Sequence, residues 1–298
     1  MQPIKLFIIF ALVLALGVWL LPSKTEHIAM LLQDQQYKKA FDELTRLYEA
    51  GDRQPQTLMR LYELHELYGN EEKMQGVLNV YRARHPDDIF VGEKLADLYF
   101  RSNQYEAYLK QLEELIDKKP KAEYARKLLA QLELGGRSDE ERRLLEKFRS
   151  MPFFSGVHAG RLGLLELNAG HQGKALDLLR RMDQLGRDDE DLFEPRLSLF
   201  RLLVQTGLIE EAYQRALDWM RFEKNDANLF VMTRQLRARG HMDLAIDLAM
   251  EARYHRAGAT FILTDLLVAQ KRFEEARMLL GAWRQASTQP STSPISVQ

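Results

Sequence analysis

The stretch Ile89–Pro120, IFVGEKLADLYFRSNQYEAYLKQLEELIDKKP, decides the fold of this chain. Leu95 and Tyr99 lie four residues apart and place an apolar stripe on a first helix, which Asn103 then interrupts. A second stripe follows, formed by Tyr105, Tyr108, Leu112 and Leu115. The stretch therefore predicts two helices joined by a tight turn, and Pro120 ends the second helix.

This turn recurs along the chain at intervals of 31 to 37 residues. The eight turn positions hold small or turn-forming residues in most repeats: Gln35, Gly69, Asn103, Gly136, Gly170, Gly207, Gly240 and Lys271. Five residues after each comes a fixed position in the second helix: Ala40, Met74, Tyr108, Glu141, Ala175, Ala212, Ala245 and Ala276. This period predicts an all-α solenoid of about eight helix–turn–helix repeats, because one hairpin is too small to bury its own apolar face.

The repeat resembles the tetratricopeptide repeat family, whose first helix has a large apolar residue, then a small one, then an aromatic one. The residues that carry the resemblance are Leu95, Ala96, Tyr99, Leu162 and Gly163, with Ala175, Ala212, Ala245 and Ala276 early in the second helices. It covers roughly residues 24–286 and implies a right-handed superhelical solenoid. The resemblance is specific for the fold and says little about function.

Some positions depart from the family pattern. Larger or polar residues stand where a small one is usual, namely Met74, Tyr108, Glu141, Phe200, Thr233 and Thr264, and we expect looser packing or shifted helix angles there. Ser138 followed by Glu141 predicts a capping box at the start of a second helix. The longest spacing predicts a longer loop near Gly186–Asp191, with Pro195 in the first turn of the next helix.

The N-terminal stretch is apolar on all sides. Every residue of Leu6–Leu21 is apolar or glycine, and with Ile4 and Lys5 a helix would span about 27 Å, close to the hydrocarbon core of a bilayer. We expect 1–22 to be an uncleaved transmembrane anchor; a signal peptide cleaved after Gly17 is the alternative. The positive charge before the span favours an inner-membrane protein with its solenoid, 23–286, in the periplasm, although a cytoplasmic solenoid stays open. The last residues, 287–298, read as a disordered tail.

Composition limits the possible functions. The chain has 298 residues, with 42 basic and 43 acidic side chains and no cysteine. A balanced charge disfavours nucleic-acid binding, which needs a basic excess. The histidines are scattered without metal-ligand spacing, and no nucleophile, base and orienting group share one predicted face. We therefore expect no metal, no cofactor and no enzymatic activity.

The family resemblance also implies candidate binding residues. First helices of the family line a groove that receives peptides or partner helices, and the matching positions here are Glu63, Glu66, Glu93, Asp97, Phe100, Arg201, Phe230, Arg234 and Arg237. Acidic residues gather in the early repeats and arginines in the later ones, which suits an extended partner of mixed charge. Ordinary solvated helix faces are the competing interpretation.

The last helix offers a second candidate surface. Met278, Leu279 and Trp283 have no following repeat to cover them, and a terminal repeat normally needs a polar outer face. We expect a docking face for a partner or for a second copy of the chain. Trp219 occupies the same register as Trp283 two repeats earlier, and core packing is the favoured interpretation there.

These features favour a membrane-tethered scaffold that recruits a protein partner into an envelope complex. The resemblance implies that bacterial proteins of this layout serve exopolysaccharide synthesis and export, cytochrome maturation, or translocon-associated quality control. The alternative is a periplasmic substrate-binding chaperone for unfolded or nascent proteins, which would bind many unrelated apolar peptides, whereas a scaffold has one stoichiometric partner.

Overall fold

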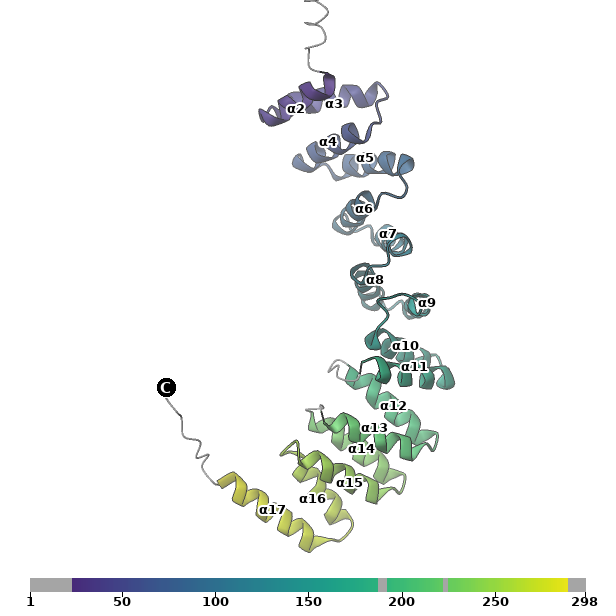
Figure 1. Ribbon diagram of the computed structural model, residues 1–298, viewed down its shortest axis with the longest axis vertical. Coiled ribbons are helices and arrows are strands. Elements are labelled where there is room, and N and C mark those ends of the chain that lie inside the picture. Colours follow the sequence, from purple (N-terminus) through teal and green to yellow (C-terminus); the bar gives the residue numbers. More distant parts are fainter. Residues whose placement is uncertain (1–22, 187–191, 222–224, 289–298) are drawn as a thin grey trace, which may run out of the picture. The chain divides into compact units, whose positions relative to one another are not determined.

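The computed structural model describes residues 23–186, 192–221 and 225–288 of the chain. Within these ranges every regular element is an α-helix, and there is no strand (Figure 1). The helices are α2 (Lys24–Gln33), α3 (Tyr37–Glu49), α4 (Pro55–Leu67), α5 (Glu71–Arg84), α6 (Ile89–Arg101), α7 (Tyr105–Lys118), α8 (Ala122–Leu134), α9 (Ser138–Phe148), α10 (Gly156–Asn168), α11 (Gln172–Leu185), α12 (Phe193–Gln205), α13 (Ile209–Met220), α14 (Asp226–Ala238), α15 (Met242–Arg253), α16 (Ala259–Ala269) and α17 (Phe273–Thr288). Consecutive helices pair as hairpins in α2/α3, α4/α5 and α6/α7, and again from α10/α11 to α16/α17, which confirms the predicted helix–turn–helix repeats.

All eight predicted turn residues adopt a positive φ. The angle lies between 57° and 87° at Gln35, Gly69, Asn103, Gly136, Gly170, Gly207, Gly240 and Lys271. At Gly207 this conformation lets the N–H of Leu208 donate to the carbonyl of Leu203 at 2.9 Å, which satisfies a carbonyl at the end of α12. The left-handed residue thus ends the first helix and reverses the chain into the second.

The position five residues after each turn is buried in every hairpin. Ala40, Ala175, Ala212 and Ala245 have no exposed surface. The larger side chains of Met74, Tyr108 and Glu141 are buried at the same position, with 1%, 6% and 2% of their surface exposed. Phe200 is also fully buried where the first helix usually has a small residue. At these four positions, therefore, the larger side chains remain inside the array and out of solvent.

The chain divides into two compact units, with the boundary inside α8. The N-terminal unit contains α2 to α7 and most of α8, and the C-terminal unit contains the end of α8 and α9 to α17. In the C-terminal unit a continuous apolar cluster extends from Ala159 to Ala276. Phe200 and Trp219 are among its largest members. Each hairpin there completes its core with side chains of the next, as a solenoid requires.

The predicted capping box at Ser138 is wrong. Ser138 is the first residue of α9, the N-cap is Arg137, and no side chain caps this end. Glu141 turns instead to Arg161 of α10, whose guanidinium donates to it at 2.7 and 2.8 Å. A charged partner therefore takes the carboxylate that a capping box would have used. Pro195 lies in the first turn of α12, as predicted, whereas 187–191 of the predicted long loop lie outside the described residues.

Two predictions fall largely on residues that the structure does not describe. The predicted anchor, 1–22, lies entirely outside the described ranges, and none of the helices inside them is long and apolar enough to span a bilayer. The anchor stays a prediction, as does the right-handed path of the solenoid. At the other end α17 continues to Thr288, two residues into the predicted tail, and 289–298 lie outside the described residues.

Candidate partner-binding surfaces

The predicted groove residues divide between the two units. The N-terminal unit holds Glu63 and Glu66 on α4, with Glu93, Asp97 and Phe100 on α6. The C-terminal unit holds Arg201 on α12, with Phe230, Arg234 and Arg237 on α14. All of these side chains are exposed except Glu93, which is half-buried. The two sets therefore belong to different units of the chain.

A hollow of about 370 Å³ lies between α4 and α6 in the N-terminal unit. Its lining residues are Tyr62, Glu66, Lys94, Asp97, Phe100 and Arg101. The register carried over from the family identified three of them, Glu66, Asp97 and Phe100. It missed the two cations, Lys94 and Arg101, because they stand beside the groove register. The hollow is consequently mixed in charge, although its predicted residues are mainly acidic.

Glu66 organises one side of this hollow. The hydroxyl of Tyr62 donates to it at 3.1 Å, and the guanidinium of Arg101 lies 3.8 Å away. Burial and the nearby Glu66 carboxylate raise the pKa of Tyr62 to about 12, so the phenol stays protonated near neutral pH. Lys94 lies over the Tyr62 ring at 5.9 Å. These contacts use part of the hydrogen-bonding capacity and charge of Glu66, and less of both remains for a ligand.

Glu93 joins two neighbouring hairpins. The hydroxyl of Tyr124 on α8 donates to its carboxylate, and the ammonium of Lys121 donates to the same oxygen at 3.0 Å. The Tyr124 hydrogen bond, followed by those of Lys121, holds the pKa of Glu93 below its ordinary value despite partial burial. Glu93 therefore stabilises the stacking of α6 on α8. Glu63, in contrast, is exposed to solvent.

The first helices α12 and α14 of the C-terminal unit differ because two of their arginines are unpaired. Arg201 and Arg234 stand six residues before their turn glycines, are exposed, and form no ion pair with any part of the chain that the structure describes. Phe230 and Phe261 stand ten residues before their turns, with 49% and 52% of their surface exposed. Arg201 of α12, Arg234 and Phe230 of α14, and Phe261 of α16 are here called the arginine face.

Two residues of this region lay outside the sequence-based selection. Asp265 of α16 approaches Arg237 at 3.6 Å, so Arg237 is partly neutralised within the array. Phe261 repeats the position of Phe230 one hairpin later. Both could have been found from the register, since Asp265 occupies the place that Arg201 and Arg234 hold in the preceding hairpins.

The predicted terminal docking residues do not share one environment. Met278 is 66% exposed, whereas Leu279 packs against the apolar cluster of the C-terminal unit. The ring of Trp283 meets Phe261 of α16 edge to face, with centroids 4.9 Å apart, and is half-buried. Leu279 and Trp283 therefore attach α17 to the solenoid. Met278 is the member of the three that offers a free apolar side chain.

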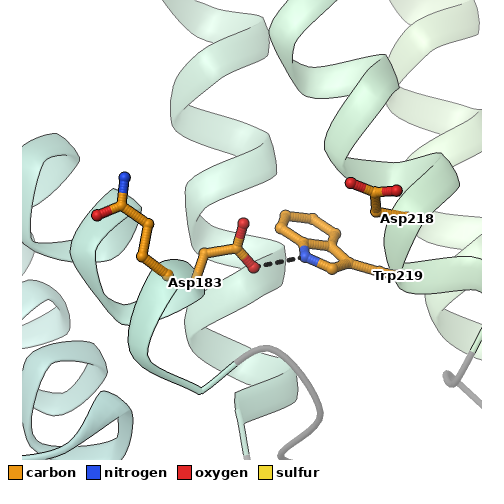
Figure 2. Close-up of a pocket in the computed structure, with 4 residues that line it drawn as sticks. Asp183, Asp218 and Trp219 are labelled. Carbon is orange, nitrogen blue, oxygen red and sulfur yellow. Dashed lines mark hydrogen bonds between the residues drawn. The ribbon is translucent and has the colours of Figure 1, made fainter.

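Trp219 is a core residue, as predicted, with 2% of its surface exposed. Its indole N–H donates to Asp183 Oδ1 at 2.7 Å, which connects α13 to α11 of the preceding hairpin (Figure 2). Arg215 also donates to Asp183. A hollow of about 350 Å³ adjoins these residues, but hydrogen bonds inside the array already occupy Asp183 and Trp219. This hollow therefore belongs to the packing of two hairpins.

Glu166 is a buried carboxylate in the last turn of α10. Lys174 donates to Oε1 at 2.8 Å, and His171 lies 2.6 Å from Oε2. Burial alone would raise the pKa of Glu166, but the hydrogen bonds from Lys174 and His171 outweigh burial and lower it. His171 follows a turn glycine and closes this network. Among the described residues no cluster of three or more potential metal ligands occurs.

No family model and no curated protein matches the chain. Among solved structures, the chain is similar to the one titled "Structure of Naa15/Naa10 bound to HypK-THB", with 13% identity over 82% of this chain and 38% of that one, and a TM-score of 0.49. It is also similar to PilF of Pseudomonas aeruginosa, with 15% identity over 71% of this chain and 96% of that one, and a TM-score of 0.40. A tetratricopeptide repeat protein from Parabacteroides merdae shares 14% identity over 82% of this chain and 97% of that one, with a TM-score of 0.35. The chain spans 38% of the length of the first of these structures. The helical-repeat architecture rests on the hairpins described above.

Proposed function

We propose that this chain is a non-catalytic scaffold whose arginine face binds an acidic, partly apolar segment of a protein partner. One observation carries the proposal: Arg201 and Arg234 are exposed and form no ion pair with any described residue, and the rings of Phe230 and Phe261, on the same series of first helices, are half-exposed. A guanidinium can hold a carboxylate through two parallel hydrogen bonds, and exposed aromatic rings supply apolar contact at low conformational cost.

The charge pattern favours this face over the first-helix hollow of the N-terminal unit. In that hollow Glu66 is held by Tyr62 and Arg101, so much of its hydrogen-bonding capacity is used within the fold. On the arginine face the guanidinium groups of Arg201 and Arg234 keep their hydrogen-bonding capacity for a partner. Anchors of the arginine and aromatic types also dominate the binding energy of many protein interfaces.

The proposal includes a membrane tether. Its support is the apolar run Leu6–Leu21, which is long enough for one span, with Lys5 on the short N-terminal side. We place the solenoid in the periplasm, in an envelope complex such as one for exopolysaccharide synthesis or export. A reporter enzyme that is active only outside the cytoplasm, fused after Gln298, should be active; activity of only a cytoplasmic reporter would reverse the orientation.

Site-specific crosslinking tests the binding face. A photo-reactive phenylalanine analogue at Phe230 of the full chain should yield one predominant adduct in native membranes, identified by mass spectrometry. The same analogue at Val157, which is 44% exposed on α10 of the same unit, is the matched control and should not yield that adduct. A ladder of unrelated adducts at Phe230 would favour the chaperone instead.

Charge reversal then tests the arginines. Arg201→Glu with Arg234→Glu should remove the Phe230 adduct while leaving the thermal midpoint unchanged, because both side chains are exposed. The matched control reverses Arg46 and Arg84, which are exposed on second helices of the N-terminal unit. An adduct that survives reversal of Arg201 and Arg234 would refute the proposed role of this face.

A further inference from the structure

The second helices of the C-terminal unit form a hollow of their own. It has a volume of about 480 Å³ and lies between α13 and α15, on helices that contribute nothing to the arginine face. Its lining residues are Tyr213, Leu217, Arg221, Asp247, Met250, Glu251 and Tyr254. No part of the proposed function uses this hollow.

The hollow keeps apolar surface that the core does not cover. α13 and α15 turn Ala212, Ala216, Ala245 and Ala249 into the core, where all four are completely buried. On α15, Met250 is 41% exposed, and Tyr254, the residue that follows the helix, is 76% exposed. Leu217 and Tyr213 of α13 are half-buried and line the same hollow. Large apolar and aromatic side chains gathered in a concave place are typical of an interaction site.

Two carboxylates border this apolar surface. Asp247 and Glu251 lie four residues apart, one helical turn, and both line the hollow. Neither forms an ion pair with any described residue. Burial, assisted by the charges of Asp247, Glu210 and Glu251, raises the pKa of Tyr213, in keeping with a negative potential at this end of the hollow.

The nearby cations already have partners. Arg221 lies 4.0 Å from Asp218, and Arg253 lies over the Tyr254 ring at 5.8 Å. Arg272 interacts electrostatically with Asp247, but its hydrogen bonds go to Glu275 at 2.7 and 2.6 Å. The carboxylates of Asp247 and Glu251 therefore remain available to a ligand.

We propose that this hollow binds a basic amphipathic segment of a second protein partner. A lysine or arginine of the segment pairs with Asp247 and Glu251, and an apolar side chain lies against Leu217 and Met250. The same negative charge repels nucleic acid and anionic lipid, which disfavours both as occupants. The C-terminal unit would then have two surfaces, on different helices, for partners of opposite charge.

A designed peptide provides the probe. A fluorescein-labelled amphipathic peptide of about 15 residues, built from Leu, Lys and Ala, is titrated with the full chain and followed by fluorescence anisotropy. A counterpart with Glu in place of Lys tests the sign of the charge. We expect saturable binding of the lysine peptide that weakens as salt rises, and no binding of the glutamate peptide.

Variants then locate the binding. Asp247→Asn with Glu251→Gln should weaken the lysine peptide roughly fivefold, and Met250→Asp should weaken it at least as much. The charge-matched control is Asp177→Asn with Glu274→Gln. Asp177 stands two residues after Ala175, as Asp247 stands two after Ala245, and it lies outside the hollow; Glu274 is 82% exposed. The control should leave the affinity unchanged, and circular dichroism should show equal helix content in all variants.

Three results would overturn the proposal. They are no binding of the lysine peptide at about 100 μM, equal loss of affinity in the control variant, and a wild-type dimer in sedimentation that Met250→Asp converts to a monomer. The last would assign the hollow to a second copy of the chain. Arg201→Glu with Arg234→Glu should leave the affinity for the lysine peptide intact. Failure of the proposal for this hollow can therefore be told apart from failure of the proposal for the arginine face.

Discussion

Arg161 and Glu141 join α10 to α9 through two parallel hydrogen bonds, Nε to Oε1 at 2.7 Å and Nη2 to Oε2 at 2.8 Å. Glu141 stands where an alanine is usual and is 2% exposed, whereas the Arg161 side chain is 35% exposed and also lies 3.4 Å from Glu133. The pair is therefore asymmetric. Arg161 has water and a second carboxylate available to it, and Glu141 has one cation and no access to solvent.

We expect Arg161→Met to lower the free energy of unfolding by about 2 kcal/mol, because it leaves a buried carboxylate without its cation. Glu141→Met should lower the free energy of unfolding by less, because the side chain of Arg161 can then turn to solvent and to Glu133. The double variant Glu141→Met/Arg161→Met should come within about 1 kcal/mol of wild type, because methionine fills similar space without a charge. Urea denaturation of the four proteins in a double-mutant cycle measures this, and strictly additive losses would contradict the asymmetry.

The turn residues provide a second prediction. Lys271 and Gln35 adopt φ angles of 63° and 57°, a conformation that glycine reaches without the steric cost borne by a side chain. We expect Lys271→Gly to raise the free energy of unfolding by about 0.5 to 1 kcal/mol. Gly207→Ala should lower it by about 1 kcal/mol, and that loss isolates the backbone, because a Cβ there would meet no atom within 4 Å. Thermal unfolding followed by circular dichroism measures both; a destabilising Lys271→Gly would show that the lysine side chain outweighs the backbone.

Trp219 and Asp183 provide a third prediction. Trp219→Phe removes the N–H that donates to Asp183 at 2.7 Å and leaves a small void where the larger indole was buried. We expect the free energy of unfolding to fall by about 2 kcal/mol, from the lost hydrogen bond to a charged group and the lost contacts together. Trp283→Phe is the control. Trp283 is half-buried in the last helix, so this substitution should lower the free energy of unfolding by less. Chemical denaturation of both variants compares them.

Acid stability depends on Glu166. Its pKa is lowered in the folded chain, so it contributes stability above its unfolded pKa and loses that contribution as pH falls through the folded value. The unfolding midpoint of the wild type should therefore decline below about pH 5. The lowered pKa values of Glu93, Glu146 and Glu211 act in the same direction.

Glu166→Gln should make that decline shallower between about pH 5 and pH 3, because one of the titrating carboxylates is gone. Glu274→Gln is the control, since Glu274 is 82% exposed and outside this network. Thermal midpoints at half-unit pH intervals compare the three proteins. Identical slopes for wild type and Glu166→Gln would show that the hydrogen bonds from Lys174 and His171 do not govern acid unfolding.

The helical repeats could be predicted because their causes are local. A turn residue in the left-handed region and a buried position five residues later recur in each hairpin, and both leave a periodic trace in the sequence. The capping box at Ser138 failed for the opposite reason. Serine followed three residues later by glutamate is a local signal, but Arg161, from the next helix, holds Glu141 instead. A contact between helices overrode a rule about one helix.

The candidate surfaces were only partly predictable. Register selected Arg234 and Phe230 as groove positions, and both are exposed, because exposure follows the helical period. Register could not distinguish Arg234, which is free of ion pairs, from Arg237, which approaches Asp265 at 3.6 Å. The hollow between α13 and α15 had no sequence signal, since it is formed by residues of two hairpins that are separate in the chain.

The sequence by itself determined that this chain is an array of helical hairpins, where each hairpin turns, and which positions are buried, because φ preferences and apolar periodicity act over a few residues. Only the tertiary structure decided which charges remain available. A carboxylate or guanidinium is neutralised by whatever the neighbouring hairpin places within about 4 Å of it, and that depends on packing between residues some 30 positions apart.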